Sequence, residues 1–222
     1  MDLLAFARGP GLVASVAILA VGIAWRLYAI FARPAPVDYS EARSTATVSG
    51  ALRAIVSRMW PYRPFAQRSL AATINAYAYH IGLAVVVFGF APHIGFMERY
   101  TGVAWPAVPR WVFVLAVGLV FLGMIAALVA RFRSPVLRLL STFDDYASWA
   151  IVMLPMVTGM ALITSFESRS AVPLDPGPVA IHLLTVELLL VWLPFSKLSH
   201  AFLVFVSRGV TGARFVRRGA AL

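Results

Sequence analysis

The sequence predicts an all-α integral membrane bundle of five transmembrane helices, with the N-terminus outside and the C-terminus in the cytoplasm. Three observations lead to this prediction: the composition, the length of the apolar blocks and the placement of the arginines. Hydrophobic residues make up 61% of the 222 residues and charged residues 13%, whereas soluble domains are about 45–50% apolar and about 25% charged. With a mean hydropathy of +0.84, the chain is expected to place most of its length in lipid.

Five apolar blocks are each long enough to cross a hydrocarbon core about 30 Å thick, which takes roughly 20 helical residues. The predicted membrane helices are 11–31, 73–96, 111–130, 147–166 and 179–206. Prolines gather in the connections, and no internal repeat divides the chain, so we expect a single membrane domain over residues 1–222. The first block lacks a convincing cleavage site of small residues and is interpreted as a retained helix.

Arginines are unevenly distributed over the predicted connections. Thirteen fall on one side of the membrane: six in residues 32–72, three in 131–138 and four in the C-terminal tail. The other side holds four, which are Arg8, Arg99, Arg110 and Arg169. The positive-inside rule then places the C-terminus in the cytoplasm, in agreement with an odd number of helices. We predict a multi-pass protein of the bacterial cytoplasmic (inner) membrane, surrounded by membrane lipid.

The composition also excludes several classes of chemistry. The chain has no cysteine, which excludes disulfides, iron–sulfur ligation and the covalent attachment of c-type haem. Its net charge of +10 could suggest nucleic acid. The arginines, however, lie in short stretches between apolar blocks, as topology signals do, so we expect no nucleic-acid partner.

The first cytoplasmic loop contains a stripe of apolar residues at helical spacing. The stripe consists of Leu52, Ile55, Val56 and Met59, and Arg53 and Arg58 lie off it. This pattern is typical of an interfacial amphipathic helix or of a docking surface for a partner. A loop helix that covers its own bundle is the alternative, and the sequence leaves both open.

All four histidines of the chain fall in two predicted helices, His80 and His93 in the second and His182 and His200 in the fifth. An unsatisfied imidazole inside a membrane costs several kcal/mol, and ionisable residues there are functional candidates. The two helices are antiparallel, so His80 is expected near the cytoplasmic end with His200, and His93 near the outer end with His182. Each pair could supply both axial ligands of one non-covalent b haem, which predicts two b-type haems. Hydrogen bonds between helices are the alternative.

The spacing of the two pairs differs. His182 and His200 are 18 residues apart, five turns of a helix, so on a continuous helix they share one face about 27 Å apart. His80 and His93 are 13 residues apart, so on a straight helix the directions of their side chains would differ by roughly 220° around the axis. Pro92 precedes His93, and a proline kink could re-aim it.

Other polar and small residues allow two interpretations each. Arg26 and Lys197 lie near cytoplasmic helix ends, where they either pair with haem propionates or extend to the interface. Glu187, inside the fifth helix, is interpreted first as structural, with proton release from quinol as an alternative. Gly82 and Gly89 make room either for a macrocycle or for a close helix.

Several segments resemble the gamma subunit of respiratory nitrate reductase. They are Tyr79-His80-Ile81-Gly82, Pro194-Phe195-Ser196-Lys197-Leu198-Ser199-His200, the pair Trp25-Arg26 and the loop from Ser134-Pro135 to Asp144. In that family five helices bind two b haems, quinol is oxidised near the outer haem, and electrons pass to a cytoplasmic iron–sulfur subunit. The resemblance implies haem-ligand roles for His80, His182 and His200.

Two features depart from that family. Its second ligand on helix two comes ten residues after the first, where this chain has Phe90, so His93 has to take over that role. The connection between the fourth and fifth helices is also shorter here. Both features favour the wider superfamily, which includes the cytochrome b subunits of membrane-bound hydrogenases and of dissimilatory sulfur complexes.

The predicted function is therefore that of a di-haem cytochrome b subunit of a respiratory oxidoreductase complex, which transfers electrons between the quinone pool and a partner redox subunit. Whether the chain itself is an enzyme stays open. A mono-haem cytochrome that uses His80 and His200, and a haem-free transporter or assembly subunit, are the alternatives. The quinone site is predicted at the outer end around Arg110, Trp105 and Trp111. Arg110 falls roughly where the resembling subunits keep a basic residue, and interfacial anchoring is the other interpretation of these three side chains.

Overall fold

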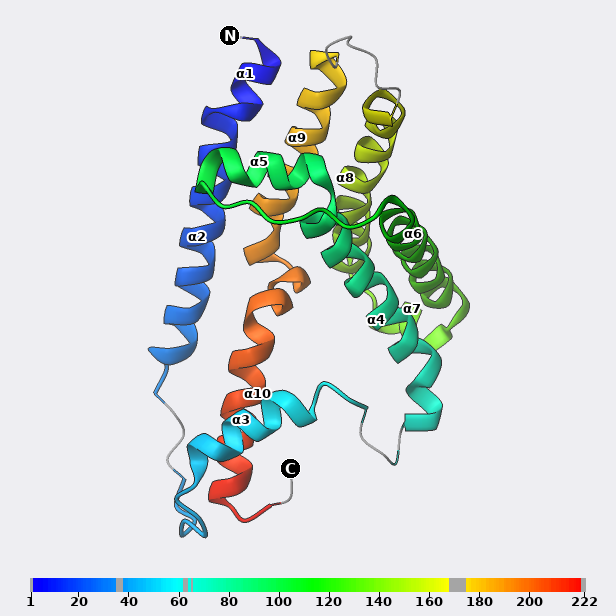
Figure 1. The fold of residues 1–222 in the computed structure, drawn as a ribbon. Helices are drawn as coiled ribbons and strands as arrows, with labels where there is room; N and C mark the ends of the chain where they lie inside the picture. The colour runs from blue at the N-terminus through cyan, green and yellow to red at the C-terminus, as the bar shows by residue number, and fades with distance from the viewer. Residues whose placement is uncertain (1, 35–37, 62–63, 65, 168–174, 221–222) are drawn as a thin grey trace. The chain divides into compact units, whose positions relative to one another are not determined.

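The computed structural model describes residues 2–34, 38–61, 64, 66–167 and 175–220. Within these ranges the regular elements are helices, and no strand occurs (Figure 1). The contacts divide the chain into two compact units, one made of residues 1–60 and 142–222 and the other of residues 61–141. In the sequence, the second unit is therefore an insertion into the first. The single domain predicted over residues 1–222 stays a prediction.

The larger unit is organised around α9 (Pro176–Trp192), which contacts α1 (Leu3–Arg8), α2 (Pro10–Phe31) and α8 (Phe143–Glu167). Figure 1 shows α2 and α9 running in one direction and α8 in the other. Proline is the first residue of both α2 and α9, where its missing N–H costs no helix bond. Asp175 caps α9 by accepting a hydrogen bond from the Gly177 amide at 3.0 Å.

The loop predicted to be amphipathic forms α3 (Thr47–Ser57), which packs against α10 (His200–Arg217). The two backbones approach closely at Gly50 and Gly212, both buried. A Cβ at Gly50 would lie 3.0 Å from the Gly212 carbonyl oxygen, so each helix needs glycine at this point. Ile55 also faces α10, with its Cδ1 3.7 Å from where a Cβ of Gly209 would be. The predicted helix is confirmed, and one of its faces covers α10.

The inserted unit is a pair of long helices, α4 (Ala66–Gly89) and α6 (Arg110–Arg133), packed along each other with α5 (Ala91–Thr101) and α7 (Pro135–Leu140) at their ends. Asn75 donates a hydrogen bond from its side-chain amide to the Gly123 carbonyl of α6 at 3.0 Å. At Gly82 a Cβ would lie 2.8 Å from the Ala116 carbonyl oxygen. Gly82 therefore serves the close approach of α6, one of its two sequence-based interpretations.

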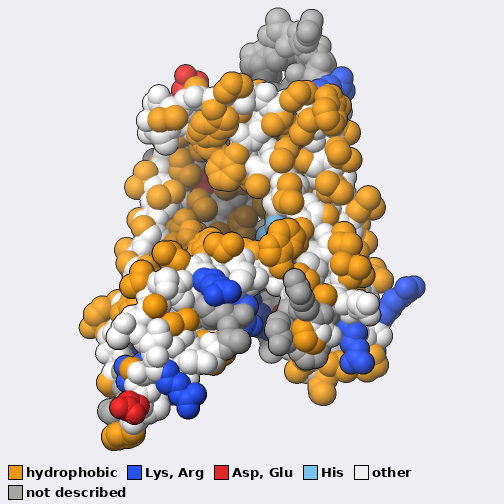
Figure 2. Space-filling model, turned by 60° about the horizontal axis from the view of Figure 1, so that its bottom comes forward, with side chains coloured by type: hydrophobic (Ala, Val, Ile, Leu, Met, Phe, Trp, Pro, Cys, Tyr) orange, Lys and Arg blue, Asp and Glu red, His pale blue; other side chains and the backbone are white. Residues whose placement is uncertain are grey.

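Five helices of the described residues are long and apolar enough to cross a membrane, as predicted. They are Leu3–Phe31, Ala66–Gly89, Arg110–Arg133, Phe143–Ile163 and Pro176–Phe195. Large apolar side chains on them point outward, among them Val13, Val21 and Leu122, and hydrophobic side chains cover most of the face in Figure 2. Water would penalise this much exposed apolar surface, whereas lipid does not. The chain is thus suited to be a multi-pass membrane protein.

The predicted helix 73–96 is two helices. α4 ends at Gly89, Phe90 is extended with φ −82° and ψ 125°, and α5 begins at Ala91. Pro92 lies in the first turn of α5, where a proline favours the start of a helix, so the expected kink is a complete break. Figure 1 shows α5 running across the end of α4. His93 consequently lies on α5, beyond the candidate membrane span.

The predicted helix 179–206 is also interrupted. α9 ends at Trp192, and two 3₁₀ turns, η2 (Leu193–Phe195) and η3 (Lys197–Ser199), precede α10. Pro194 has no N–H to continue α9, and the extended Ser196 starts η3 by accepting a hydrogen bond from the Leu198 amide at 3.1 Å. The expectation that His182 and His200 share one face of a continuous helix was wrong, because each lies on a different helix.

Adding a methyl group at Gly82 is expected to destabilise the inserted unit. Gly82→Ala gains about 0.5–1 kcal/mol of helix propensity, but its Cβ meets the α6 backbone, and overpacking of this kind costs about 1–3 kcal/mol. We expect a lower midpoint of thermal unfolding, followed by circular dichroism in detergent.

Gly118→Ala on α6 is the matched control, since a Cβ there has no neighbour within 4 Å. That variant should unfold at the parent temperature or slightly above it. Equal midpoints for the two variants would contradict the close packing of α4 on α6.

Candidate functional site

Each of the four histidines has its Nδ1 atom within hydrogen-bond distance of an oxygen. In three of them the oxygen is a main-chain carbonyl: Ala76 O at 2.7 Å for His80, Val86 O at 2.9 Å for His93 and Lys197 O at 2.8 Å for His200. A carbonyl only accepts hydrogen bonds, so Nδ1 carries the proton in these three rings. Nε2 is then the nitrogen with the lone pair, the one that can ligate a metal.

His182 contacts a side chain of α8. Its Nδ1 lies 3.0 Å from the Thr158 hydroxyl oxygen, and that hydroxyl also lies 2.9 Å from the Leu154 carbonyl oxygen and 3.1 Å from the Thr185 hydroxyl oxygen. A hydroxyl both donates and accepts, so this contact is compatible with either tautomer of His182. Gly159 leaves space for the ring, since a Cβ there would lie 3.1 Å from His182 Cε1. Thr158 and Gly159 were not expected from the sequence, because their contacts with His182 join residues on different helices.

His80 and His93 differ in their surroundings within the inserted unit. His80 is an exposed residue of α4 whose ring stacks on Tyr79, with ring centroids 4.3 Å apart. His93 meets the edge of Phe90 at 5.3 Å between centroids, and Phe90 in turn stacks on Phe113 of α6 at 4.3 Å. Burial lowers the pKa of His93, and its bonds to the carbonyls of α4 partly oppose that shift.

The end of α4 is held by donors from three positions beyond it. His93 bonds Val86 O, the Trp105 indole donates to Phe88 O at 2.5 Å, and the Val108 amide donates to Gly89 O at 2.9 Å. The carbonyls of Phe88 and Gly89 belong to the last turn of α4, where a helix leaves its carbonyl groups without intrahelical partners. Trp105, predicted at the quinone site, therefore has a structural contact here. Gly89 allows the close approach of Val108, whose Cγ1 lies 2.9 Å from where a Cβ would be.

The other two residues of the predicted quinone site lie at the start of α6. Arg110 is its first residue and Trp111 its second, and both are exposed. Arg110, Trp105 and Trp111 all belong to the inserted unit, as His93 does. The quinone role of the three stays a prediction.

The break between α9 and α10 is held by Arg26 of α2 and by the start of α8. Arg26 Nε donates to Pro194 O at 2.8 Å. The Lys197 amide donates to Asp144 Oδ2 at 2.8 Å, and Lys197 Nζ lies 2.5 Å from Asp145 Oδ2. The side chains of Arg26 and Lys197 thus fix the segment that leads into His200. Their predicted contact with haem propionates stays a prediction.

Ser148 and Trp192 extend this network into α8 and α9. The Ser148 hydroxyl donates to Asp144 Oδ1 at 2.8 Å, and the Trp192 indole donates to the Ser148 oxygen at 2.9 Å. Ser148 is a buried polar residue, so the bonds satisfy groups that would otherwise be costly to bury. In the sequence, Asp144 is notable only as the end of the loop that resembles the nitrate reductase family. The sequence does not indicate that Asp144 pairs with Lys197.

Glu187 lies on α9, the helix that packs against α1 and α2. The residue is buried, and its Oε1 has no hydrogen-bond partner within the described part of the chain. Its Oε2 lies 2.7 Å from the point where a Cβ of Gly11 would be, so Gly11 makes the space that the carboxyl group occupies. Both interpretations of Glu187, the structural one and proton release from quinol, stay predictions.

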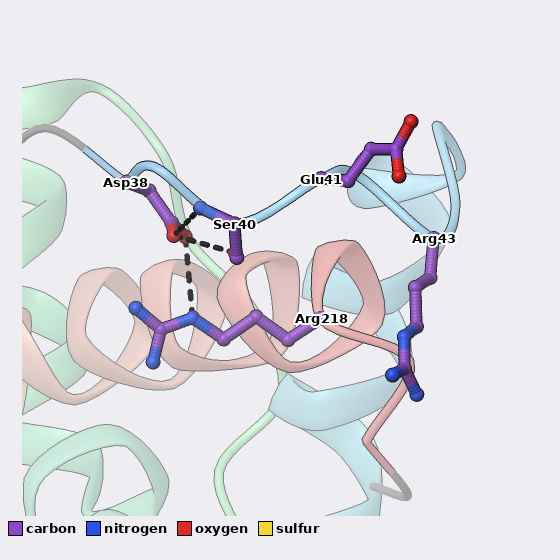
Figure 3. A pocket seen from close by; sticks show the side chains of 5 residues that line it. All are labelled: Asp38, Ser40, Glu41, Arg43 and Arg218. Atoms are coloured by element: carbon purple, nitrogen blue, oxygen red, sulfur yellow. Dashed lines mark hydrogen bonds and ion pairs between the residues drawn. The ribbon is translucent and has the colours of Figure 1, made fainter.

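A polar pocket beside the C-terminal end of α10 lies apart from these residues (Figure 3). It is lined by Asp38, Ser40, Glu41, Arg43 and Arg218. Asp38 accepts bonds from the Ser40 hydroxyl at 2.6 Å and from Arg218 Nε at 3.2 Å. The Ser40 hydroxyl, the Ser40 amide and Arg218, in decreasing order, lower the pKa of Asp38 from 3.8 to about 2.

Comparison with known proteins gives one relative of undescribed function. A protein of Nitratidesulfovibrio vulgaris is 29% identical over 213 residues, which are 95% of this chain and 88% of the relative, and its name states no activity. No family model matches the chain. No solved structure matches it either.

Acid is expected to release the 38–40 segment from α10. A carboxyl whose folded pKa is lowered stabilises the fold above its unfolded pKa, here 3.8, and loses that contribution as the pH falls through about 2. A carbon NMR titration of the solubilised protein should show Asp38 titrating near pH 2. Ser40→Ala should raise that midpoint more than Arg218→Gln does, and an unchanged midpoint in both variants would contradict the contacts in Figure 3.

Proposed function

We propose that the chain is a di-haem b cytochrome, the membrane subunit of a respiratory oxidoreductase complex that exchanges electrons between the quinone pool and a partner redox subunit. The observation that carries the proposal is the state of the histidines. All four hold Nδ1 against an oxygen, and in His80, His93 and His200 that oxygen is a carbonyl, which favours the tautomer in which Nε2 is the ligating nitrogen. Metal-ligating histidines almost always donate their other N–H to a carbonyl, carboxylate or water in this way.

A haem asks the protein for fewer ligands than a bare metal ion does. Among the residues that the structure describes, no group of three or more His, Asp or Glu side chains could hold a metal ion, whereas a b haem needs only two axial imidazoles. A haem held by two imidazoles supplies reversible one-electron transfer when it is bound. His80, His93, His182 and His200 would be the ligands.

The chain's own contacts would orient these ligands. Thr158 fixes the ring of His182, and the Lys197 carbonyl fixes that of His200. Arg26 and Lys197 steady the segment before His200, and in the proposal they also offer cationic groups to propionates. The pairing of His80 with His200 and of His93 with His182 rests on the order of the helices in the sequence.

We propose the quinone site around Arg110, with Trp105 and Trp111 beside it in the sequence. A quinone needs an apolar slot and one or two polar groups to fix its oxygens. Trp105 would line such a slot while its indole N–H stays with Phe88 O, so its contribution would be the ring face. Arg110, exposed at the start of α6, is the polar group.

The proposed orientation rests on the arginine distribution. With thirteen arginines on one side, the positive-inside rule predicts a cytoplasmic C-terminus, and we propose the bacterial inner membrane. Arg63, one of the thirteen, and Arg169, on the other side, lie outside the described residues. The proposed partner is a cytoplasmic iron–sulfur subunit, as in the nitrate reductase gamma family that the sequence resembles. A hydrogenase-linked or sulfur-linked cytochrome b of the same superfamily is the alternative within this class.

One observation also supports a haem-free membrane component. The Nδ1 bonds satisfy a polar group of each imidazole, and histidines with a purely structural role would make the same bonds. A transporter or assembly subunit would therefore show the same side-chain contacts. The visible spectrum separates the two classes, because only a b cytochrome has a sharp reduced α band.

Ligand replacement is expected to remove the haems one at a time. In the purified chain, His200→Ala or His80→Ala should abolish one low-spin b signal and halve the haem content, while His182→Ala or His93→Ala should abolish the other. The measurements are the reduced-minus-oxidised spectrum and the haem content per chain.

Asn75→Ala is the matched control for these variants. It removes a partly buried hydrogen bond between α4 and α6 without removing a proposed ligand, so both signals should persist. Full haem content in the His200 variant would refute the pairing, and a colourless parent protein would refute the whole proposal.

The orientation can be tested with reporter fusions. Fusions after Leu222 and within residues 38–61 should report the cytoplasm, because they follow the arginine-rich connections, whereas fusions at Trp105 and Asp175 should report the outside. Alkaline phosphatase and green fluorescent protein give opposite signals on the two sides. An external C-terminus would remove the basis for a cytoplasmic partner.

A further inference from the structure

The helix α3 has a face of small residues that is already occupied. Gly50 and Ala54 are buried against α10, and a Cβ at Gly212 would clash with Ala54 and with the Gly50 carbonyl. The Arg43 amide also donates to Arg217 O at 2.8 Å, next to this contact. Packing against α10 thus fixes the rotation of α3 about its own axis, and this rotation determines which side chains the other faces of α3 expose.

A second face of α3 is apolar and exposed. Val48, Leu52, Val56 and Trp60 follow one another at intervals of four residues, so they form one stripe along the helix and the turn after it. Their exposed fractions are 74%, 61%, 67% and 70%. The stripe lies outside the five candidate membrane spans, so burial in a transmembrane position does not account for it.

A third face is polar and carries positive charge. Arg53 and Ser57 are exposed there, about 100° and 140° around the helix from Leu52 at 100° per residue. Arg58 lies over the ring of Phe215, 5.8 Å from its centroid, and Arg208 donates to the Met59 sulfur at 2.8 Å. Cationic groups therefore border the stripe on the α10 side as well.

The direction of α3 suits the surface of a membrane. In Figure 1, α3 lies crosswise to α2 and α9 of the same unit, which are two of the candidate spans. α2 leads into its loop, and α10 follows α9 after the break. A helix that runs across the direction of the spans, near where they end, runs along the membrane plane.

We propose that α3 is an interfacial helix that binds anionic lipid. The stripe Val48, Leu52, Val56 and Trp60 enters the boundary between headgroups and acyl chains, and Arg53 and Arg58 contact lipid phosphates. An apolar face with a tryptophan at its end and arginines on the polar side is the composition of helices that lie in this layer. Basic residues near an anionic surface are attracted to it, so the charge favours anionic headgroups over zwitterionic ones.

The absence of cysteine from the chain allows a direct test by single-cysteine spin labelling. Leu52→Cys reports the stripe, Ser57→Cys is the matched control on the polar face of the same helix, and Leu122→Cys on α6 is a reference for lipid exposure. The full chain is reconstituted in phosphatidylcholine vesicles with or without phosphatidylglycerol. The accessibility of each label to oxygen, which partitions into lipid, is compared with its accessibility to a water-soluble nickel chelate.

With phosphatidylglycerol present, the Leu52 label should be oxygen-accessible and chelate-protected like the Leu122 label, while the Ser57 label stays chelate-accessible. Removing phosphatidylglycerol, or introducing Arg53→Gln with Arg58→Gln, should raise the chelate accessibility of the Leu52 label. A Leu52 label as chelate-accessible as the Ser57 label in both lipid mixtures overturns the proposal and marks the stripe as a docking face for a protein. A Leu52 label shielded from both reagents overturns it too, since the chain itself then covers the stripe. Val56→Cys repeats the test in case labelling at Leu52 disturbs the fold.

Discussion

A main-chain carbonyl released by a break in a membrane helix needs a donor, because lipid offers no water to replace the lost bond. This constraint governs both interruptions of the chain. At the end of α4, donors come from His93, Trp105 and the Val108 amide. At the end of α9, Arg26 satisfies Pro194 O and His200 satisfies Lys197 O. Aspartates at the start of α8 hold the intervening turn from the other side.

The same constraint connects the fold to the candidate ligands. His93 is in the first turn of α5 and His200 is the first residue of α10, so each follows a break and helps to satisfy it through Nδ1. An imidazole has two nitrogens, and the one that satisfies the backbone determines what the other can do. A role in the fold and a role in ligation are therefore compatible in one side chain, and removing such a histidine tests both. This is why the haem spectrum has to be measured beside a fold control such as Asn75→Ala.

Much of the fold could be predicted from the sequence, because hydropathy alone delimits a membrane span. The five predicted helices agree with the candidate spans, apart from the two that break. Pro92 suggested only a kink, since a proline within an apolar run does not reveal whether the chain continues or turns. The sequence could not assign partners to Thr158, Gly159 and Asp144, because it does not specify which helices lie next to one another. The histidines could be selected by their rarity and position, whereas their tautomers required the structure.

The crossing of α3 and α10 has a consequence for biogenesis. Gly50 and Gly212 are 162 positions apart in the numbering, and the whole inserted unit is synthesised between them. Contacts that close such long loops form late, and chains are made from the N-terminus at about 5–20 residues per second. The segment 47–57 therefore emerges many seconds before its partner helix exists. During that interval its apolar residues have no protein surface to cover them, and a chain that ends before residue 212 would leave them in that state for good.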